Sequence, residues 1–150
     1  MIFCRKVCQI LATFACASLL GCSSLGRGKH ACAILLESCD LNCSQMVVLP
    51  VSRLSVPAIP VPLFTEKDIS DVSVQRCGCG CTFAVTLTDH ASYEMYQLLF
   101  DAAGRKLLLQ CGGATIGFSL IGVGNDVHRL VFIPEISDEA CCSLFCRDKK

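Results

Sequence analysis

The second half of the chain carries the clearest pattern of apolar and polar positions. From Phe83 to Thr88 the two kinds alternate, as in a half-buried strand. Asp89 is placed to cap a helix, and Gly104 is placed to end it. Apolar residues of that helix recur at intervals of three and four, which predicts an apolar face made of Tyr93, Tyr96, Leu99, Phe100 and Ala103.

Three more apolar segments follow the helix. They run over 106–111, 114–121 and 127–133, with turns at Gly112-Gly113 and at 122–126. The order is strand-helix-strand-strand-strand. We therefore expect an α+β fold, in which one helix packs on a small antiparallel sheet braced by disulfides.

The first half of the chain is less regular. Residues 32–43 fit a short helix or strand followed by a turn, and Cys39 and Cys43 would share a face of a helix. Residues 46–64 contain Pro50, Pro57, Pro60 and Pro62, which exclude a helix or a central strand there. The apolar residues between these prolines predict an extended segment packed against the domain. Residues 66–75 are polar and predict a surface segment.

The N-terminus is typical of an export signal. Arg5 and Lys6 precede a largely apolar run over 7–20, which is shorter than the roughly 20 residues that cross a bilayer. The run ends in Leu19-Leu20-Gly21-Cys22, followed by Ser23 and Ser24. This ending resembles the lipobox of bacterial lipoproteins. Cys22 as an ordinary cysteine after an ordinary signal peptide is the alternative.

The lipobox resemblance implies a diacylglyceryl group on the Cys22 thiol and a palmitoyl chain on its freed amine. More than one acyl chain gives stable anchoring, so the lipid bilayer would be the first partner. Because Ser23 is not the Asp that often retains lipoproteins at the inner membrane, the resemblance favours the outer membrane of a bacterial envelope.

These patterns divide the chain into five parts. They are a removed signal peptide (1–21), a lipidated tether (22–31), a Cys/Pro-rich extended segment (32–81), an α+β domain (82–136) and a Cys-containing C-terminal tail (137–150).

Charge and cysteine content narrow the classes of function. The formal net charge is +0, and no basic stripe indicates a nucleic-acid partner. Fourteen cysteines in an exported chain predict disulfides without determining their pairing. Apart from the signal segment and Cys22, the candidates are Cys32, Cys39, Cys43, Cys77, Cys79, Cys81, Cys111, Cys141, Cys142 and Cys146.

The run RCGCGC, from Arg76 to Cys81, has a second interpretation. Three closely spaced thiolates suit zinc or copper(I). Structural zinc sites more often use pairs separated by two to four residues, and the chain contains no Cys-x-x-Cys pair. We therefore expect disulfides and no cofactor, with the run bracing the N-terminal segment against the domain. An anchored thiolate metal-binding protein is the alternative.

A second resemblance covers residues 83–123. Val85-Thr86-Leu87-Thr88, Ala91, Gly104-Arg105-Lys106-Leu107 and Gly112-Gly113 stand where the periplasmic head subdomain of the SecD export subunit has similar residues. The resemblance implies a shared fold. It does not carry protein export to this chain, which lacks that family's transmembrane helices.

The sequence contains no constellation typical of an enzyme, since His30, His90 and His128 are scattered. The cysteine density resembles that of cysteine-rich envelope proteins that are cross-linked by disulfides. The expected function is thus a non-enzymatic, anchored envelope lipoprotein with a structural or protein-interaction role. Disulfide-linked envelope proteins would be its further partners, and no small-molecule substrate is evident.

Overall fold

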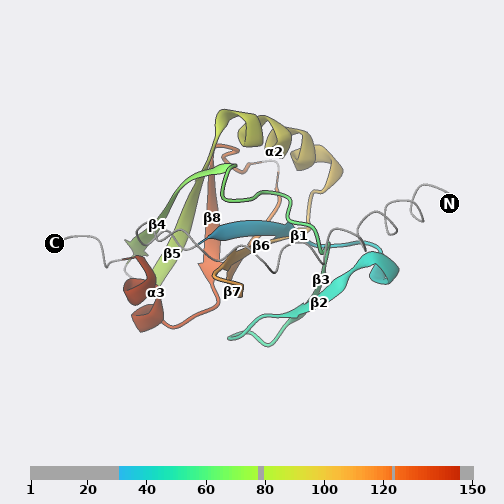
Figure 1. Cartoon of the computed structure of the whole chain (residues 1–150). Coiled ribbons are helices and arrows are strands. Elements are labelled where there is room, and N and C mark those ends of the chain that lie inside the picture. Colours follow the sequence, from blue (N-terminus) through green and yellow to red (C-terminus); the bar gives the residue numbers. More distant parts are fainter. Residues whose placement is uncertain (1–30, 78–79, 123, 146–150) are drawn as a thin grey trace, which may run out of the picture.

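The computed structural model describes residues 31–77, 80–122 and 124–145. Figure 1 shows a strongly twisted sheet with helix α2 on one side and a separate β-hairpin on the other. In chain order the elements are β1 (Cys32–Leu36), the 3-10 helix η1 (Leu41–Cys43), β2 (Gln45–Val48), β3 (Ser55–Ala58), β4 (Ile69–Cys77), β5 (Gly80–Leu87), α2 (Asp89–Asp101), β6 (Lys106–Cys111), β7 (Ala114–Leu120), β8 (Arg129–Pro134) and α3 (Asp138–Phe145).

The main sheet has six strands in the order β1-β6-β7-β8-β5-β4, and every pairing is antiparallel. The predicted fold class is therefore wrong: the domain is mostly β, with a large curled sheet in place of one helix on a small sheet. Four of the six strands lie where the pattern predicted them. The sheet is larger because β1 and β4 extend it at its two edges.

Each added edge strand has a physical reason. Strand β1, with the sequence CAILL, is buried over most of its length because the sheet is covered on both faces there. Strand β4 lies where the sequence predicted a polar surface segment. Its Val72 and Val74 pack against the core, whereas Asp71 and Gln75 are exposed. An edge strand with one solvated face alternates in this way.

The hairpin of β6 and β7 confirms the predicted turn. Gly112 and Gly113 both have positive φ, at 60° and 81°. Two consecutive positive φ values match the two-residue turn that follows the twist of a hairpin, and glycine adopts them without a steric cost. The hairpin places Lys106 opposite Leu120 and Cys111 opposite Ala114.

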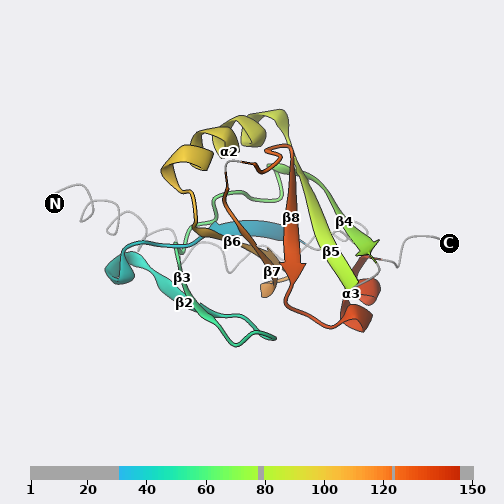
Figure 2. The same ribbon diagram turned by 180° about the vertical axis from the view of Figure 1, so that it is seen from behind.

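Strands β2 and β3 form a separate two-stranded hairpin, which we term the arm (residues 45–58). Pro57 lies in β3, opposite Met46. This pairing suits proline because a two-stranded hairpin has only edge strands. The arm packs on the face of the sheet opposite α2, as Figures 1 and 2 show from two sides.

Two predictions for α2 are wrong. Its N-cap is Thr88, whose side-chain oxygen accepts a hydrogen bond from the Ala91 N–H, so Asp89 is the first helical residue. The buried face consists of Ala91, Ser92, Met95 and Leu99. Of the apolar set predicted from the sequence only Leu99 is buried; Tyr93, Tyr96, Phe100 and Ala103 are exposed. The small buried residues let the helix lie close to the sheet.

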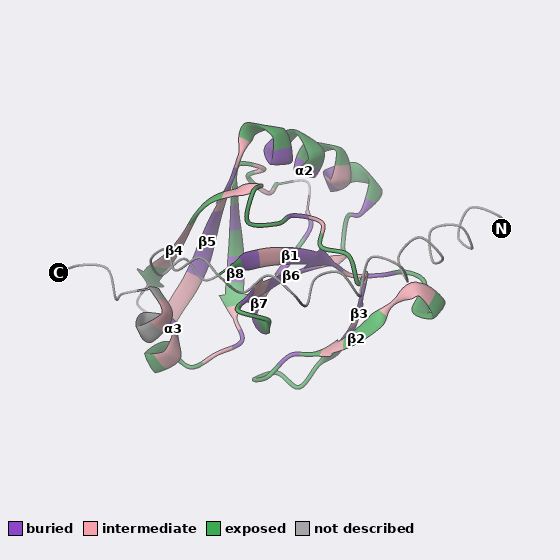
Figure 3. Ribbon diagram, in the orientation of Figure 1, coloured by how far each residue is buried: buried purple, intermediate pink, exposed green. Residues whose placement is uncertain are grey.

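The two faces of the sheet have separate buried clusters. The cluster under α2 contains large side chains such as Phe64, Phe83 and Phe132. The cluster under the arm consists of Leu35, Leu49, Val56, Ala58 and Leu108. Figure 3 shows the buried positions concentrated along β1, β5 and β6 and the exposed ones on the outer side of α2 and along the arm.

Candidate functional site

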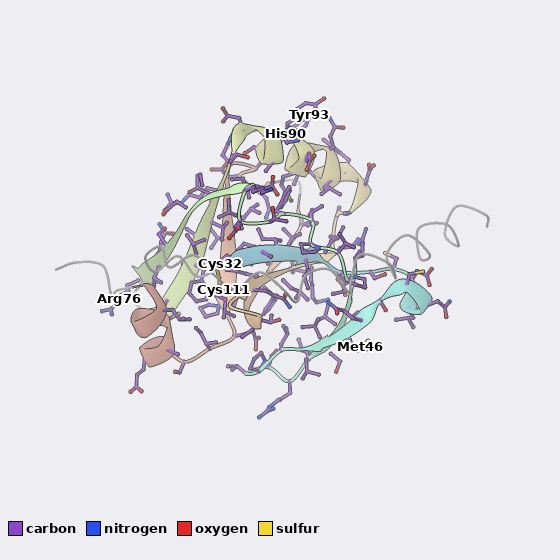
Figure 4. The ribbon with its side chains drawn as sticks, viewed as in Figure 1. Cys32, Met46, Arg76, His90, Tyr93 and Cys111 are labelled. Carbon is purple, nitrogen blue, oxygen red and sulfur yellow. A yellow bond between two sulfur atoms is a disulfide. The ribbon has the colours of Figure 1, made fainter. Side chains whose placement is uncertain are left out.

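A disulfide joins Cys32 to Cys111, and the two residues stand directly opposite each other on β1 and β6. Their Cα atoms are 4.2 Å apart, and both side chains are buried. The bond confirms that the chain forms a disulfide and supplies one pairing that spacing alone could not choose. Figure 4 shows the two residues next to each other. The disulfide links the edge strand β1, the first strand after the predicted tether, to its neighbour β6.

The next two cysteine candidates lie around the 3-10 helix η1. Cys39 is exposed and is a free thiol, whereas Cys43 is half-buried in η1 itself. The Asp40 carboxylate caps η1 by accepting the Asn42 N–H at 2.9 Å. Of the two alternatives for residues 32–43, the strand followed by a turn is the one that forms, as β1 and η1, and Cys39 and Cys43 do not share an α-helical face.

The described residues of the RCGCGC run lie where β4 ends and β5 begins. Cys77 ends β4 opposite Gly80, and Cys81 lies in β5 opposite Arg76. The two ends of the run therefore lie on neighbouring strands of one sheet. The predicted disulfides from this run to the N-terminal segment stay a prediction. Gly80 has φ 140°, a value that favours glycine.

Helix α3 brings the C-terminal cysteines to the same corner of the molecule. It contains Cys141 and Cys142 and packs against β4 and β5. Cys141 is buried in the core beneath α2, and Cys81 packs against that core. The structure thus groups parts of two cysteine clusters that are 60 residues apart in the sequence. Cys22, Cys79 and Cys146 lie outside the described residues.

The described part of the chain brings no cluster of metal-ligand side chains together. No three His, Cys, Asp or Glu side chains there are grouped to hold a metal ion. The thiolate site proposed for RCGCGC includes Cys79, so it stays a prediction. His90 lies on the surface of α2, with its Nε2 3.4 Å from Glu94 Oε1. His128 is exposed, and its backbone N–H donates to Asp126.

Sequence reasoning missed a buried carboxylate, Glu135, which holds the arm to the sheet. The side chain is 2% exposed, and its Oε2 accepts the N–H groups of Val51 at 2.8 Å and of Ser52 at 2.9 Å. Burial opposes ionisation, but the hydrogen bonds from Ser52 and Val51 prevail and hold the pKa of Glu135 below its ordinary value. Glu135 follows β8 directly, where a lone acid gives no sequence signal.

Sequence reasoning also missed the exposed aromatic face of α2. Tyr93, Tyr96 and Phe100 follow one another at intervals of three and four, so they share one side of the helix. The rings of Tyr96 and Phe100 meet edge to face, with centroids 5.9 Å apart. We term Tyr93, Tyr96 and Phe100 the aromatic stripe. Figure 4 shows Tyr93 and His90 on the side of α2 that faces away from the sheet.

Solved structures of SecDF have a similar fold. A crystal structure of SecDF in a super-membrane-facing form matches with a TM-score of 0.54 at 13% sequence identity, over 76% of this chain and 18% of that chain. A structure of SecDF described as a membrane component that enhances protein export also matches with a TM-score of 0.54 at 13% identity. That match covers 83% of this chain and 69% of that one. No protein-family model matches the chain, and no curated protein does.

At 13% identity these comparisons show the fold alone. They support the predicted weak resemblance to the periplasmic region of SecD, and they say nothing about a lipobox. The chain spans only 18% of the first of these SecDF chains. Across 31–77, 80–122 and 124–145, no helix is both long and apolar enough to cross a bilayer.

Proposed function

We propose that this protein is a non-enzymatic envelope lipoprotein, anchored through a lipidated Cys22 and presenting a disulfide-braced domain for protein interaction. The observation that carries the proposal is the Cys32–Cys111 disulfide. Disulfides persist in oxidising compartments, and this bond begins at the first described strand, ten residues after the lipobox-like Cys22. The fold likeness to SecDF, a membrane component, is consistent with an envelope protein.

The residues before β1 would form the tether. Residues 23–31 are small, glycine-containing and basic, a composition that behaves as a flexible chain. Two or more acyl chains on Cys22 would hold this tether stably in a bilayer. Because Ser23 follows Cys22, the outer membrane is the proposed destination.

The interaction role has two described elements. Cys39 is an exposed free thiol, which suits a disulfide to another envelope protein. The aromatic stripe provides a non-covalent surface, since Tyr and Phe are enriched at protein interfaces. Both lie outside the buried clusters, so a partner could contact them without opening the domain.

The anchor is tested by replacing Cys22 with Ser in a bacterial host that is labelled with palmitate. We expect the parent chain to incorporate the label and to sediment with membranes, and Cys22→Ser to lose both properties. Cys39→Ser is the matched control, because it removes an exposed thiol outside the lipobox, and it should keep the label. A Cys22→Ser protein that still carries palmitate would contradict the proposal.

The choice of membrane needs a separate measurement. In a density gradient that separates the two membranes, the parent chain should band with the outer membrane, and replacement of Ser23 by Asp should move it to the inner one. A parent chain that bands with the inner membrane would contradict the outer-membrane destination and leave the anchor itself standing.

A further inference from the structure

The aromatic stripe has features of a binding surface. Tyr93, Tyr96 and Phe100 expose 65%, 51% and 64% of their surface although they are among the largest apolar side chains in the chain. The opposite side of α2 is packed into the core through Ala91, Met95 and Leu99. The stripe is therefore carried on a helix that is already fixed in place, which lowers the ordering cost of binding.

The exposed charged groups of α2 that flank the stripe are carboxylates, with His90 as the other ionisable side chain besides the tyrosines. Within α2 the carboxylates of Asp89, Glu94 and Asp101 are exposed, and the helix contains no Lys or Arg. His90 is beside Glu94. The next basic residue along the chain is Arg105, whose guanidinium N–H groups donate hydrogen bonds to the Glu37 carbonyl oxygen. Along α2 the stripe is thus flanked by carboxylates and by no Lys or Arg.

We propose that the aromatic stripe binds a protein segment in which Lys or Arg side chains stand next to apolar ones. Cationic side chains are attracted to aromatic ring faces and to carboxylates, and the apolar neighbours would cover the exposed rings. A second copy of this chain would bring three carboxylates against three. An anionic bilayer would repel the same groups. This inference names the partner class for the proposed interaction role and does not depend on lipidation of Cys22.

The chain itself supplies a probe for this site. It has two tyrosines and no tryptophan, and both tyrosines belong to the stripe. Tyrosine fluorescence of the full chain therefore reports on this surface alone. Titration with a short Lys/Leu peptide free of Tyr and Trp should change the emission in a saturable manner. The effect should weaken in high salt, because screening reduces charge attraction. The same peptide with Glu in place of Lys should give no saturable change.

Variants separate the two parts of the surface, with affinity measured by the anisotropy of a dye-labelled Lys/Leu peptide. Asp89→Asn/Glu94→Gln/Asp101→Asn removes the charge and keeps the rings, whereas Tyr96→Ser/Phe100→Ser removes two rings and keeps the charge. Each should weaken binding by about tenfold or more. Met46→Ser/Val48→Ser, an exposed apolar pair on β2 with 58% and 54% exposure, is the control and should bind like the parent.

Three results would overturn the inference. In the first, the Glu/Leu and Lys/Leu peptides bind equally well. In the second, the control variant weakens binding as much as the stripe variants do. In the third, anionic vesicles or self-association change the Tyr emission and the peptide does not. Palmitate labelling is measured separately. A labelled, membrane-bound chain that fails to bind the peptide would refute this inference and leave the anchor intact.

Discussion

The two faces of the main sheet are built very differently, although they share every strand. In β6, Leu108 and Leu109 are neighbours, both are fully buried, and they point to opposite faces. Among the described residues, Leu109 belongs to a cluster of 19 buried side chains beneath α2, and Leu108 to a cluster of five beneath the arm. Figures 1 and 3 show that α2 lies over one face of the sheet and the arm over the other.

The difference indicates that the helix face is the stable part of the domain and that the arm is a less stably attached part. The helix face contains the disulfide and most of the large buried side chains. The arm is held by a small cluster, by the hydrogen bonds of Glu135 and by a backbone hydrogen bond from the Ser38 N–H to the Pro57 carbonyl. Regions with few buried contacts open at lower free energy than the global unfolding of the domain. We therefore expect the arm to detach locally while the helix face stays folded.

Removal of the disulfide should have the largest effect. It closes a loop with a sequence separation of 79 residues, so Cys32→Ala/Cys111→Ala should lower the free energy of unfolding by about 4 kcal/mol. Denaturant titration measures this loss. The control is Cys39→Ala, which removes an exposed free thiol and should change stability by less than about 0.5 kcal/mol. If both changes lowered the free energy of unfolding equally, the disulfide would not be what stabilises the helix face.

The neighbouring leucines of β6 give the sharpest comparison of the faces. Leu109→Ala should cost about 4 kcal/mol, because it leaves a cavity in the large cluster. Leu108→Ala should cost about 2 kcal/mol, because the small cluster can relax by moving the arm. Hydrogen exchange would show where the loss occurs. Leu108→Ala should speed exchange in β2 and β3 more than in β5, and a uniform increase would contradict a separately opening arm.

Glu135 should affect the arm alone. Glu135→Gln keeps the shape of the side chain but replaces the charged acceptor of two hydrogen bonds by a neutral one. This should lower the free energy of unfolding by about 1 kcal/mol. Because its folded pKa is lowered, the ionised carboxylate contributes stability that is fully present above the ordinary pKa of 4.5 and is lost as pH falls through the lower folded pKa.

The corresponding measurement is the pH dependence of amide exchange in the arm. Below pH 4.5 the arm of the parent chain should lose protection progressively, and the Glu135→Gln arm should show a weaker dependence. Glu139→Gln, at an exposed position of α3, is the matched control. An identical pH dependence in the parent and in Glu135→Gln would show that Glu135 does not hold the arm.

The smallest effect on stability is expected on the solvent side of α2. Tyr93→Ser removes an exposed ring and should change the free energy of unfolding by less than about 0.5 kcal/mol. By contrast, Met95→Ala, two residues further on the buried side, should cost about 3 kcal/mol. Thermal unfolding of the two variants tests which side of the helix packs. If the two variants lost similar stability, the aromatic side of α2 would be packed against the sheet, as the sequence predicted.

The sequence predicted the strands and turns of the second half well, because alternation and paired glycines are local signals. It failed where packing decides. Strand β4 reads as polar because an edge strand shows only one face to the core. In α2 two sets of residues recur at helical spacing, and the aromatic set has the larger side chains. The smaller set is buried because a helix lying close to a sheet needs small side chains such as Ala91 and Ser92.

For the cysteines, the chemistry was predictable and the geometry was not. The predicted export and the cysteine density indicated disulfides, but pairing Cys32 with Cys111 requires knowing that β1 lies beside β6. Likewise, the approach of Cys141 to the β4–β5 hairpin depends on where α3 packs. Glu135 could not be found because its partners are backbone N–H groups more than 80 residues away.

The central claim is that an exported, anchored chain is braced by the Cys32–Cys111 bond. Peptide mass mapping of protein extracted from membranes, with free thiols alkylated first and no reductant added, tests it most directly. Trypsin should release residues 30–53 joined to residues 107–129, with fragmentation placing the link at Cys32 and Cys111. Recovery of both cysteines in alkylated form, from protein in the soluble fraction, would contradict the account.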